Sequence, residues 1–295
     1  MLQKLIYLFF LSCIPVICSA QFVEVQADYN GIGDCIFSAN NNAEVPLFLH
    51  INFGDIENTT FNEPLPYVKR LAPGYNDLFT LQRDLDAEVP RFHYEIKTYR
   101  SDPTADADLD FPYLLPFRPA SEVAIFDVKS IDGFWGTEGI DSWSATGFKA
   151  NKGTELYACR TGIVVEITKQ ERNGDSRLWY HTWNNSLTVL HNDGTLICYH
   201  NINTASAQLK VGQKIYSGQK IGRVTSQTGK LFLLIYHDSL FTKQLSFVIP
   251  QFVISETGER AILNSSKTYS VYHPRNVKVL EMNKRERKKI LGKKD

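Results

Sequence analysis

Hydrophobic and polar residues alternate with period two in the first hundred residues. Positions 47–53 read Leu-Phe-Leu-His-Ile-Asn-Phe, and positions 92–97 read Phe-His-Tyr-Glu-Ile-Lys. Such alternation, rich in aromatic and β-branched residues, is typical of half-buried strands. Turn formers separate the runs, for example three asparagines at 40–42. We therefore expect a small β-sandwich over residues 21–115.

A second β unit is predicted to follow a short connection. Residues 101–110 are acidic and poor in apolar side chains, which indicates a solvated linker. Beyond them, short apolar runs alternate with glycine-centred turns, a rhythm typical of antiparallel sheet. This pattern predicts an all-β chain with a second domain over residues 116–245. Residues 246–295 are expected to form a C-terminal β extension and a basic tail.

The basic tail spans residues 284–295, with the sequence KRERKKILGKKD. It carries seven basic and two acidic residues. Such a run is usually a solvated, frayed end of the chain. The alternative is a weak contact with an anionic polymer of the cell envelope.

Residues 1–20 have the features of a secretory signal peptide. Lys4 precedes an apolar run, and Cys18-Ser19-Ala20 places small residues before a cleavage point at Gln21. The apolar run is short for a bilayer span, although an uncleaved anchor remains the alternative. We expect a periplasmic or secreted protein with no integral membrane span after cleavage.

Net charge and cysteine count argue against nucleic-acid binding and against a disulfide framework. The 295 residues carry 32 basic and 32 acidic side chains, so there is no electrostatic case for nucleic-acid binding. Signal cleavage would leave Cys35, Cys159 and Cys198, an odd number that does not form a disulfide framework. We expect them to pack as small buried hydrophobes, with a Cys159–Cys198 bridge as the alternative.

Three segments of the second domain carry distinctive motifs. Residues 147–167 read GFKANKGTELYACRTGIVVEI, residues 187–199 read LTVLHNDGTLICY, and residues 209–222 read LKVGQKIYSGQKIG. In this order they resemble the lysostaphin/LytM-type zinc peptidases, metallopeptidase family 23. The first is similar to the family's segment that begins Asp-Phe and continues to Gly-Thr, the second to its Asp-Gly-Thr hairpin, and the third to its Gly-Gln-x-Ile-Gly segment. The resemblance implies an antiparallel β domain that cleaves peptidoglycan peptides.

The family's mechanism implies a zinc ion held by a His and an Asp upstream and by the second His of a downstream His-x-His pair. In this chain the Asp position falls on Gly147. The upstream His falls on Trp143, or near Glu138 with the longer spacing of some members. The His-x-His pair falls on Leu231 and Leu233. No zinc ligand is therefore expected at these positions, except Glu138.

Remnants of the assisting histidines are the other candidates. His191 matches a histidine before the hairpin turn, where a structural role is expected. The family's Tyr-x-His strand aligns Tyr199 with the Tyr and Asn201 with the His. His200 lies one residue early, so it should point away from the cleft unless a bulge restores it. An improvised site from Glu138, His200 and His237 is a remote alternative.

The resemblance thus predicts a degenerate member of the family that has lost catalysis and needs no cofactor. Its expected partner is peptidoglycan or an envelope protein such as a cell-wall amidase. One alternative is a zinc-dependent peptidoglycan endopeptidase with unrecognised ligands. Another is a structural accessory of an envelope complex. Fold alone does not decide among the three.

Overall fold

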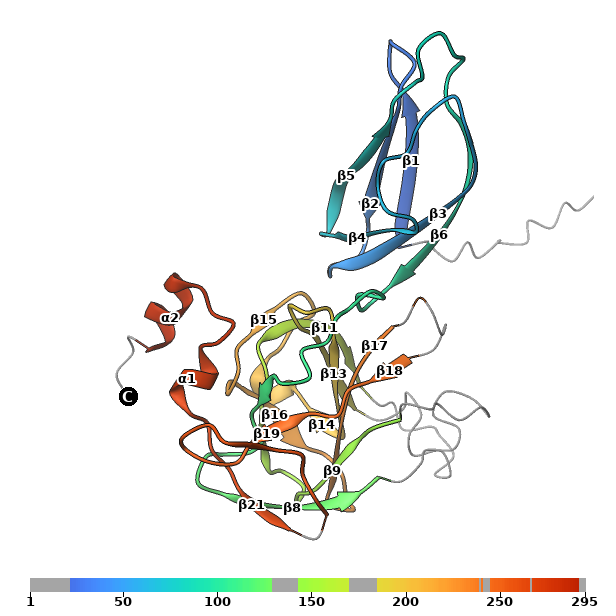
Figure 1. Cartoon of the computed structure of the whole chain (residues 1–295). Helices are drawn as coiled ribbons and strands as arrows, with labels where there is room; N and C mark the ends of the chain where they lie inside the picture. The colour runs from blue at the N-terminus through green and yellow to red at the C-terminus, as the bar shows by residue number, and fades with distance from the viewer. Residues whose placement is uncertain are drawn as a thin grey trace, which may run out of the picture.

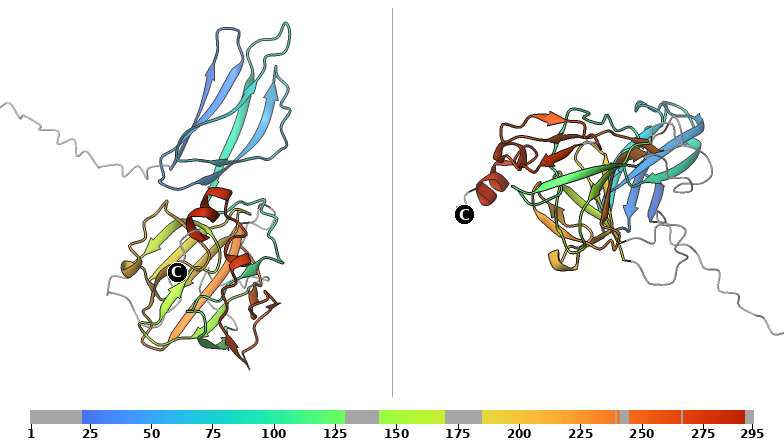
Figure 2. Two further views of the ribbon diagram at one scale, coloured as in Figure 1. Left: turned by 90° about the vertical axis from the view of Figure 1, so that its left-hand side faces the viewer. Right: turned by 90° about the horizontal axis from the view of Figure 1, so that it is seen from below.

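The computed structural model describes residues 22–128, 143–169, 185–238, 240, 245–265 and 267–291. The predicted signal peptide lies outside the described residues. Strands make up most of the regular secondary structure of the described chain, and the two α-helices lie near its end, which confirms the all-β fold class. Figures 1 and 2 show a narrow N-terminal unit standing on a larger C-terminal one. No described helix has the length and apolar character of a membrane span.

The N-terminal unit consists of two small sheets that face each other across one apolar core (Figure 1). Aromatic rings fill this core, with Phe37 stacked on Phe79 at a centroid distance of 4.7 Å. The predicted sandwich is therefore present. The first sheet runs in the order β1 (Val23–Tyr29), β2 (Cys35–Asn41) and β5 (Gly74–Leu81), and the second in the order β4 (Tyr67–Leu71), β3 (Leu47–Glu57) and β6 (Arg91–Tyr99).

One large antiparallel sheet organises the C-terminal unit. The predicted hairpin is present as its strands β12 (Ser186–Leu190) and β13 (Leu196–His200), which pair with each other in antiparallel register. Gly212 and Gly218, at φ +81° and +77°, bracket β15 as the sequence indicated. The order is β15 (Lys214–Ile215), β11 (Gly162–Thr168), β12 (Ser186–Leu190), β13 (Leu196–His200), β17 (Lys230–Asp238), β9 (Thr146–Lys149), β8 (Glu122–Asp127) and β21 (Thr268–Ser270), with β18 (Leu245–Phe247) also paired to β17.

Shorter strands close the rest of this unit. β10 (Glu155–Tyr157), β16 (Lys220–Val224) and β14 (Ile202–Asn203) form one small sheet, with a 3₁₀ turn, η1 (Ala205–Ala207), beside it. β20 (Arg260–Ala261), β19 (Gln251–Val253) and β7 (Pro112–Tyr113) form another. The β7–β19 pair is parallel, so the segment after the linker is tied to the C-terminal extension.

The large sheet has two different faces. One face carries Phe148, Tyr199, Leu231 and Leu233, all buried in the main core. Neighbours one position along each strand point to the opposite face, because side chains alternate in a strand. The opposite face, called here the outer face, includes Phe126, Gly147, Phe232, His200 and Ser186, which lie opposite one another in the register.

The sandwich is packed on one end of the outer face. Leu190 and Leu196 belong to the large sheet, yet they are buried in the core of the sandwich. Arg100 forms an ion pair with Glu166 at 2.5 Å, and the Ser101 hydroxyl donates to the Asp238 carboxylate at 2.5 Å. One continuous apolar core and these polar contacts therefore join the two units.

The predicted linker of residues 101–110 is only partly exposed. Ser101 and Pro103 are buried, whereas Asp106, Asp108 and Asp110 are exposed as expected. The apolar segment that follows packs in the main core of the C-terminal unit, through Phe111, Tyr113, Leu115 and Phe117.

The C-terminal extension ends in two helices, α1 (Arg275–Lys278) and α2 (Lys284–Leu291). The expectation of a frayed basic tail is wrong for residues 284–291, which form α2. Asn283 caps this helix, since its Oδ1 accepts from the backbone N–H of Arg285 and Glu286 at 3.0 Å each. Glu286 returns the contact by accepting from the Asn283 N–H at 2.8 Å.

Candidate functional site

The positions aligned with zinc ligands do not share one face of the sheet. Gly147 lies directly opposite Phe232 in the pairing of β9 with β17, so both belong to the outer face. Leu231 and Leu233 point the other way, into the main core. If the His-x-His pair is aligned one residue later, it falls on Phe232 and Leu234, which share the face of Gly147. Phe232 and Leu234 are also buried and apolar, at 2% and 1% exposed.

Gly147 has no room for a side chain. A Cβ atom built on it would lie 2.6 Å from the Phe126 ring and 2.8 Å from the Phe126 carbonyl oxygen. Real Cβ atoms do not approach a backbone oxygen this closely, and the carbonyl is fixed by the β8–β9 pairing. The Phe126 ring also packs against Phe232 at 5.5 Å. Aromatic carbon therefore occupies the space beside the position where the family resemblance expects an aspartate.

His200 lies on this same outer face, opposite Phe232. Its Nε2 lies 3.3 Å from the Cys198 Sγ, and the Thr188 hydroxyl donates to that sulfur at 3.5 Å. Burial lowers the pKa of His200 to about 4 and raises the pKa of the Cys198 thiol to about 12. Both groups are therefore neutral near pH 7. Asn201 leaves the strand at φ +69°, and its side-chain amide donates to the Lys230 carbonyl at 3.0 Å.

His191 is buried beside the turn that joins β12 to β13. Its ring is 1% exposed, and its Nδ1 lies 2.9 Å from the Thr195 hydroxyl across the β12–β13 turn. Nε2 is buried with no hydrogen-bond partner among the described residues. Burial, followed by the charge of Arg160, lowers its pKa well below the usual value. The His191 ring is therefore neutral near pH 7.

A buried charge network around Arg160 was missed by the sequence reasoning. The guanidinium is 3% exposed and donates to Asp193 at 2.8 Å, to Glu281 at 2.8 Å and to the Tyr113 hydroxyl at 3.1 Å. It also lies 3.7 Å from the centroid of the Phe111 ring. Burial opposes ionisation of Asp193, but the Arg160 charge outweighs it and holds the pKa of that carboxyl below its usual value.

The Arg160 network ties three parts of the chain together. Asp193 comes from the hairpin turn, Tyr113 from the segment after the linker, and Glu281 from the C-terminal extension. Burial raises the pKa of Glu281, despite its contact with Arg160. No periodic pattern predicts an ion pair between residues 121 positions apart, so only the structure reveals this network.

Trp143, His237 and Glu138 are the remaining candidates. The Trp143 ring packs against Phe247, with the ring centroids 4.9 Å apart. His237 is half-buried, and its Nδ1 lies 2.8 Å from the Asp238 carbonyl oxygen. Glu138 lies outside the described residues. The cysteines at 35, 159 and 198 are buried free thiols, which confirms their predicted packing role.

A zinc ion does not fit the donors that the structure describes on the outer face. Zinc sites need three or four N, O or S donors that converge. Here the His200 ring contacts the Cys198 sulfur, but the residues opposite them on β17 are Phe232 and Leu234, which offer no donor. Within the described ranges, no group of three or more His, Cys, Asp and Glu side chains could hold a metal ion.

Two hollows lie at the far end of β9. One has a volume of about 460 Å³ and lies between Phe126, Lys149–Asn151 and Thr228–Lys230, beside the outer face. The Lys230 ammonium lies 5.3 Å from the centroid of the Phe126 ring. This hollow therefore combines an aromatic wall with two cationic side chains.

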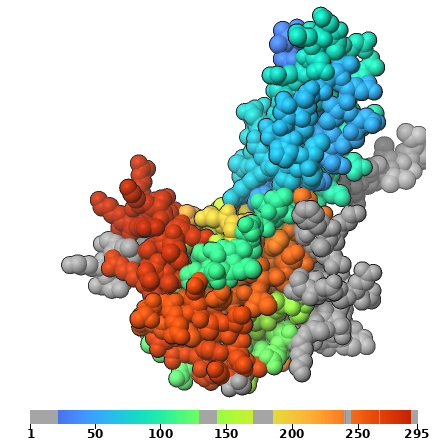
Figure 3. Space-filling model, viewed as in Figure 1, coloured from blue at the N-terminus to red at the C-terminus, as the bar shows by residue number. Residues whose placement is uncertain are grey.

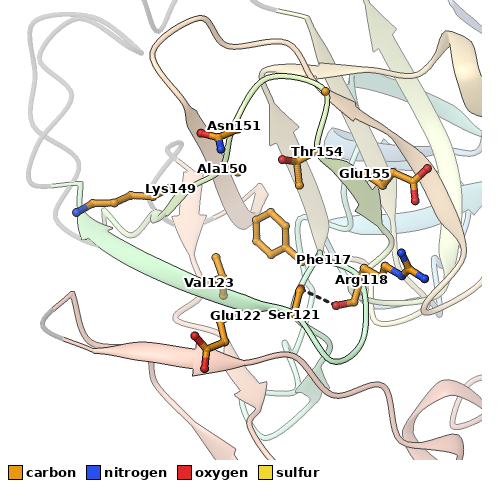
Figure 4. A pocket seen from close by; sticks show the side chains of 11 residues that line it. Phe117, Arg118, Ser121, Glu122, Val123, Lys149, Ala150, Asn151, Thr154 and Glu155 are labelled. Atoms are coloured by element: carbon orange, nitrogen blue, oxygen red, sulfur yellow. Dashed lines mark hydrogen bonds between the residues drawn. The ribbon is translucent and has the colours of Figure 1, made fainter.

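The second hollow, of about 470 Å³, adjoins the first through Lys149, Ala150 and Asn151. Figure 4 shows the Phe117 ring at its centre, with Lys149 and Glu155 reaching out on opposite sides. Lys220 and Arg223 donate to Glu155 at 2.6 and 3.1 Å, so that carboxylate is already paired. Lys149 forms no ion pair within the described residues and belongs to both hollows.

Comparisons with solved structures give distant similarities. They include a candidate glycyl-glycine endopeptidase from Ruminococcus gnavus (16% identity, 47% of this chain and 55% of that one, TM-score 0.29). Helicobacter pylori Csd3 matches at 12% identity over 88% of this chain and 57% of its own, with a TM-score of 0.32. Lysostaphin matches at 20% identity over 48% and 49%, with a TM-score of 0.27.

The chain spans about half the length of these three proteins. No curated protein matches it. Residues 141–243, however, match the sequence profile of peptidase family M23, and they include β9 through β17 of the large sheet. The predicted resemblance to lysostaphin/LytM-type peptidases is thereby confirmed for residues 141–243, the part of the chain that is similar to peptidase family M23.

Proposed function

We propose that this chain is an exported, non-catalytic member of peptidase family M23 that binds the peptide part of peptidoglycan. The similarity of residues 141–243 to this family supports a peptidoglycan-related role in the cell envelope. The loss of catalysis is inferred from one observation. The row Phe126–Gly147–Phe232 fills the outer face with carbon where the family resemblance expects metal ligands.

Binding without cleavage is consistent with the two hollows beside this face. Peptidoglycan peptides carry free carboxylates, which a lysine pairs with through charge-assisted hydrogen bonds. Lys149 is exposed, lines both hollows and has no ion-pair partner within the described residues. Phe126 and Phe117 provide apolar walls for the methyl groups of alanine residues. We therefore assign Lys149 as the principal recognition residue.

The test is co-sedimentation of the purified protein with insoluble peptidoglycan sacculi. The Lys149→Gln variant should bind at least about fivefold more weakly, because it loses a charge-assisted contact of about 1 kcal/mol or more. Lys152→Gln is the matched control: Lys152 is exposed three positions away and lines neither hollow. Equal binding by both variants would refute the assignment of Lys149. Failure of the unchanged protein to sediment would refute peptidoglycan binding itself.

An amidase or other envelope protein is the alternative partner, and capture of such a protein without sacculus binding would favour it. The zinc endopeptidase alternative would need Glu138 as a ligand, and Glu138 lies outside the described part of the chain. Metal analysis of the purified protein separates this alternative from the non-catalytic one. A purely structural accessory would bind neither sacculi nor zinc.

A further inference from the structure

Helix α2 is held on the body of the C-terminal unit by its single acidic residue. Glu286 Oε1 accepts from the Lys214 ammonium at 2.7 Å and from the Tyr216 hydroxyl at 3.1 Å. Its other oxygen accepts from the Asn283 N–H at the helix cap. The hydrogen bond from Lys214 is the largest of the contacts that lower the pKa of this carboxyl. The helix therefore presents a defined side to solvent.

The acidic residues of this segment are directed inward. Residues 275–291 contain two acidic residues, Glu281 and Glu286, and seven basic ones. Glu281 is paired with the buried Arg160, and Glu286 with Lys214. Both carboxylates therefore neutralise cations outside α2, and neither neutralises the basic side chains on the opposite side of this helix. A charge-neutral chain thus carries a local surface of one sign.

The outward side of α2 carries four exposed basic residues. These are Lys284, Arg285, Lys288 and Lys289, here called the basic face. Their spacing of i, i+1, i+4 and i+5 places them on one side of a helix with 3.6 residues per turn. None forms an ion pair among the residues that the structure describes. Figure 3 shows the C-terminal residues standing out from the body, apart from the sandwich.

We propose that the basic face of α2 binds a hydrated anionic polymer with repeating phosphate or carboxylate groups. A polymer is favoured over a bilayer because the exposed side chains of α2 at positions 284, 285 and 287–289 are all charged, without an aromatic residue to enter an apolar layer. Clustered lysine and arginine bind polyanions by releasing condensed counterions, which makes the affinity strongly salt-dependent. This contact would hold the protein at an anionic polymer independently of the hollows beside Lys149.

The test measures binding of the purified protein to long-chain inorganic polyphosphate as a function of salt. A variant with glutamine at all four basic-face positions should lose at least about tenfold in affinity and show a shallower salt dependence. The matched control removes the same charge from exposed lysines elsewhere, with Gln at Lys97, Lys152, Lys169 and Lys267. Its affinity should stay within about twofold of the unchanged protein.

Two further measurements separate loss of the basic face from unfolding or from loosening of α2. Thermal melting shows whether each variant is folded. Glu286→Gln weakens the anchoring of α2 but leaves the basic face intact, so it should retain binding. Equal losses in the four-site variant and its control would overturn the proposal, because only net charge would then matter. Tighter binding to phosphatidylglycerol vesicles than to polyphosphate would overturn it in favour of a membrane surface.

Discussion

Gly147 and Phe232 lie opposite each other on neighbouring strands, on the face of the sheet that the sandwich covers at its other end. The family resemblance places a metal-binding aspartate at Gly147, yet the Phe126 ring stands 2.6 Å from where its Cβ would be. An aspartate is therefore absent from position 147 in the sequence, and the packing around that position would not accept one. Restoring the ligand would require the aromatic residues to move.

Gly147→Ala should therefore destabilise the protein. The added methyl group meets a backbone carbonyl at 2.8 Å, and overpacking of this kind costs about 1–3 kcal/mol. Gly31→Ala is the control, because nothing lies within 4 Å of a Cβ at that position. The free energy of unfolding in urea should fall for the first variant and change by less than about 0.5 kcal/mol for the second. Equal stability would show that Phe126 yields readily.

Leu233→His should cost stability without creating a zinc site. The leucine is 1% exposed in the main core, on the face away from Gly147, and a buried polar group without a partner costs about 1–3 kcal/mol beyond the lost packing. Leu233→Met keeps the volume and should cost less than about 1.5 kcal/mol. A rise in the melting temperature of Leu233→His on addition of zinc would contradict the assignment of faces.

Much of the fold was predictable because strand periodicity and glycine turns are local signals. The hairpin of residues 187–199 and the strand between Gly212 and Gly218 follow from them directly. The face of the sheet to which each side chain points was harder to predict, because it depends on the register of the strand pairing. A one-residue shift exchanges Leu231 and Leu233 for Phe232 and Leu234, and the sequence of the strand is apolar at each of these positions.

Long-range polar contacts could not be predicted at all. The Arg160–Glu281 pair depends on how the C-terminal extension returns to the domain, which no pattern of residues encodes. For the same reason the sequence predicted a frayed end in place of α2. Lys214, the partner of Glu286, is distant in sequence. Chemistry assembled from separate segments becomes visible only in three dimensions.

The stability of the protein should fall on acidification partly through His200. Its pKa is about 4 in the folded state and about 6.5 when exposed, so the unfolded state binds a proton first as the pH falls. The contribution is complete above pH 6.5 and declines toward pH 4. Between pH 7 and pH 4, the unchanged protein should lose on the order of 3 kcal/mol more than His200→Asn.

Chemical denaturation across this pH range measures the difference. His93→Asn is a suitable control because His93 is exposed on β6. It should keep the pH dependence of the unchanged protein. If His200→Asn showed that same dependence, the buried neutral state of His200 would be refuted.

Arg160→Met should be among the most destabilising single changes. It would leave Asp193 and Glu281 buried without their cation, and breaking a buried pair in this way costs about 3–5 kcal/mol. The C-terminal extension should also become sensitive to limited proteolysis, because Glu281 would lose its anchor. Arg285→Met, at an exposed position of α2, should change stability by less than about 0.5 kcal/mol. An intact extension in Arg160→Met would show that apolar packing alone holds it.

The proposal that the M23-like domain of this chain is non-catalytic is tested most directly by measuring zinc and peptidoglycan cleavage in one preparation. Elemental analysis of the purified protein should find much less than one zinc per chain. Chelator should leave its melting temperature unchanged, because only a metal bound to the native state would stabilise it. Incubation with peptidoglycan and added zinc should release no cross-link fragments. One zinc per chain, together with fragments that disappear on chelation, would contradict the account and establish a zinc endopeptidase.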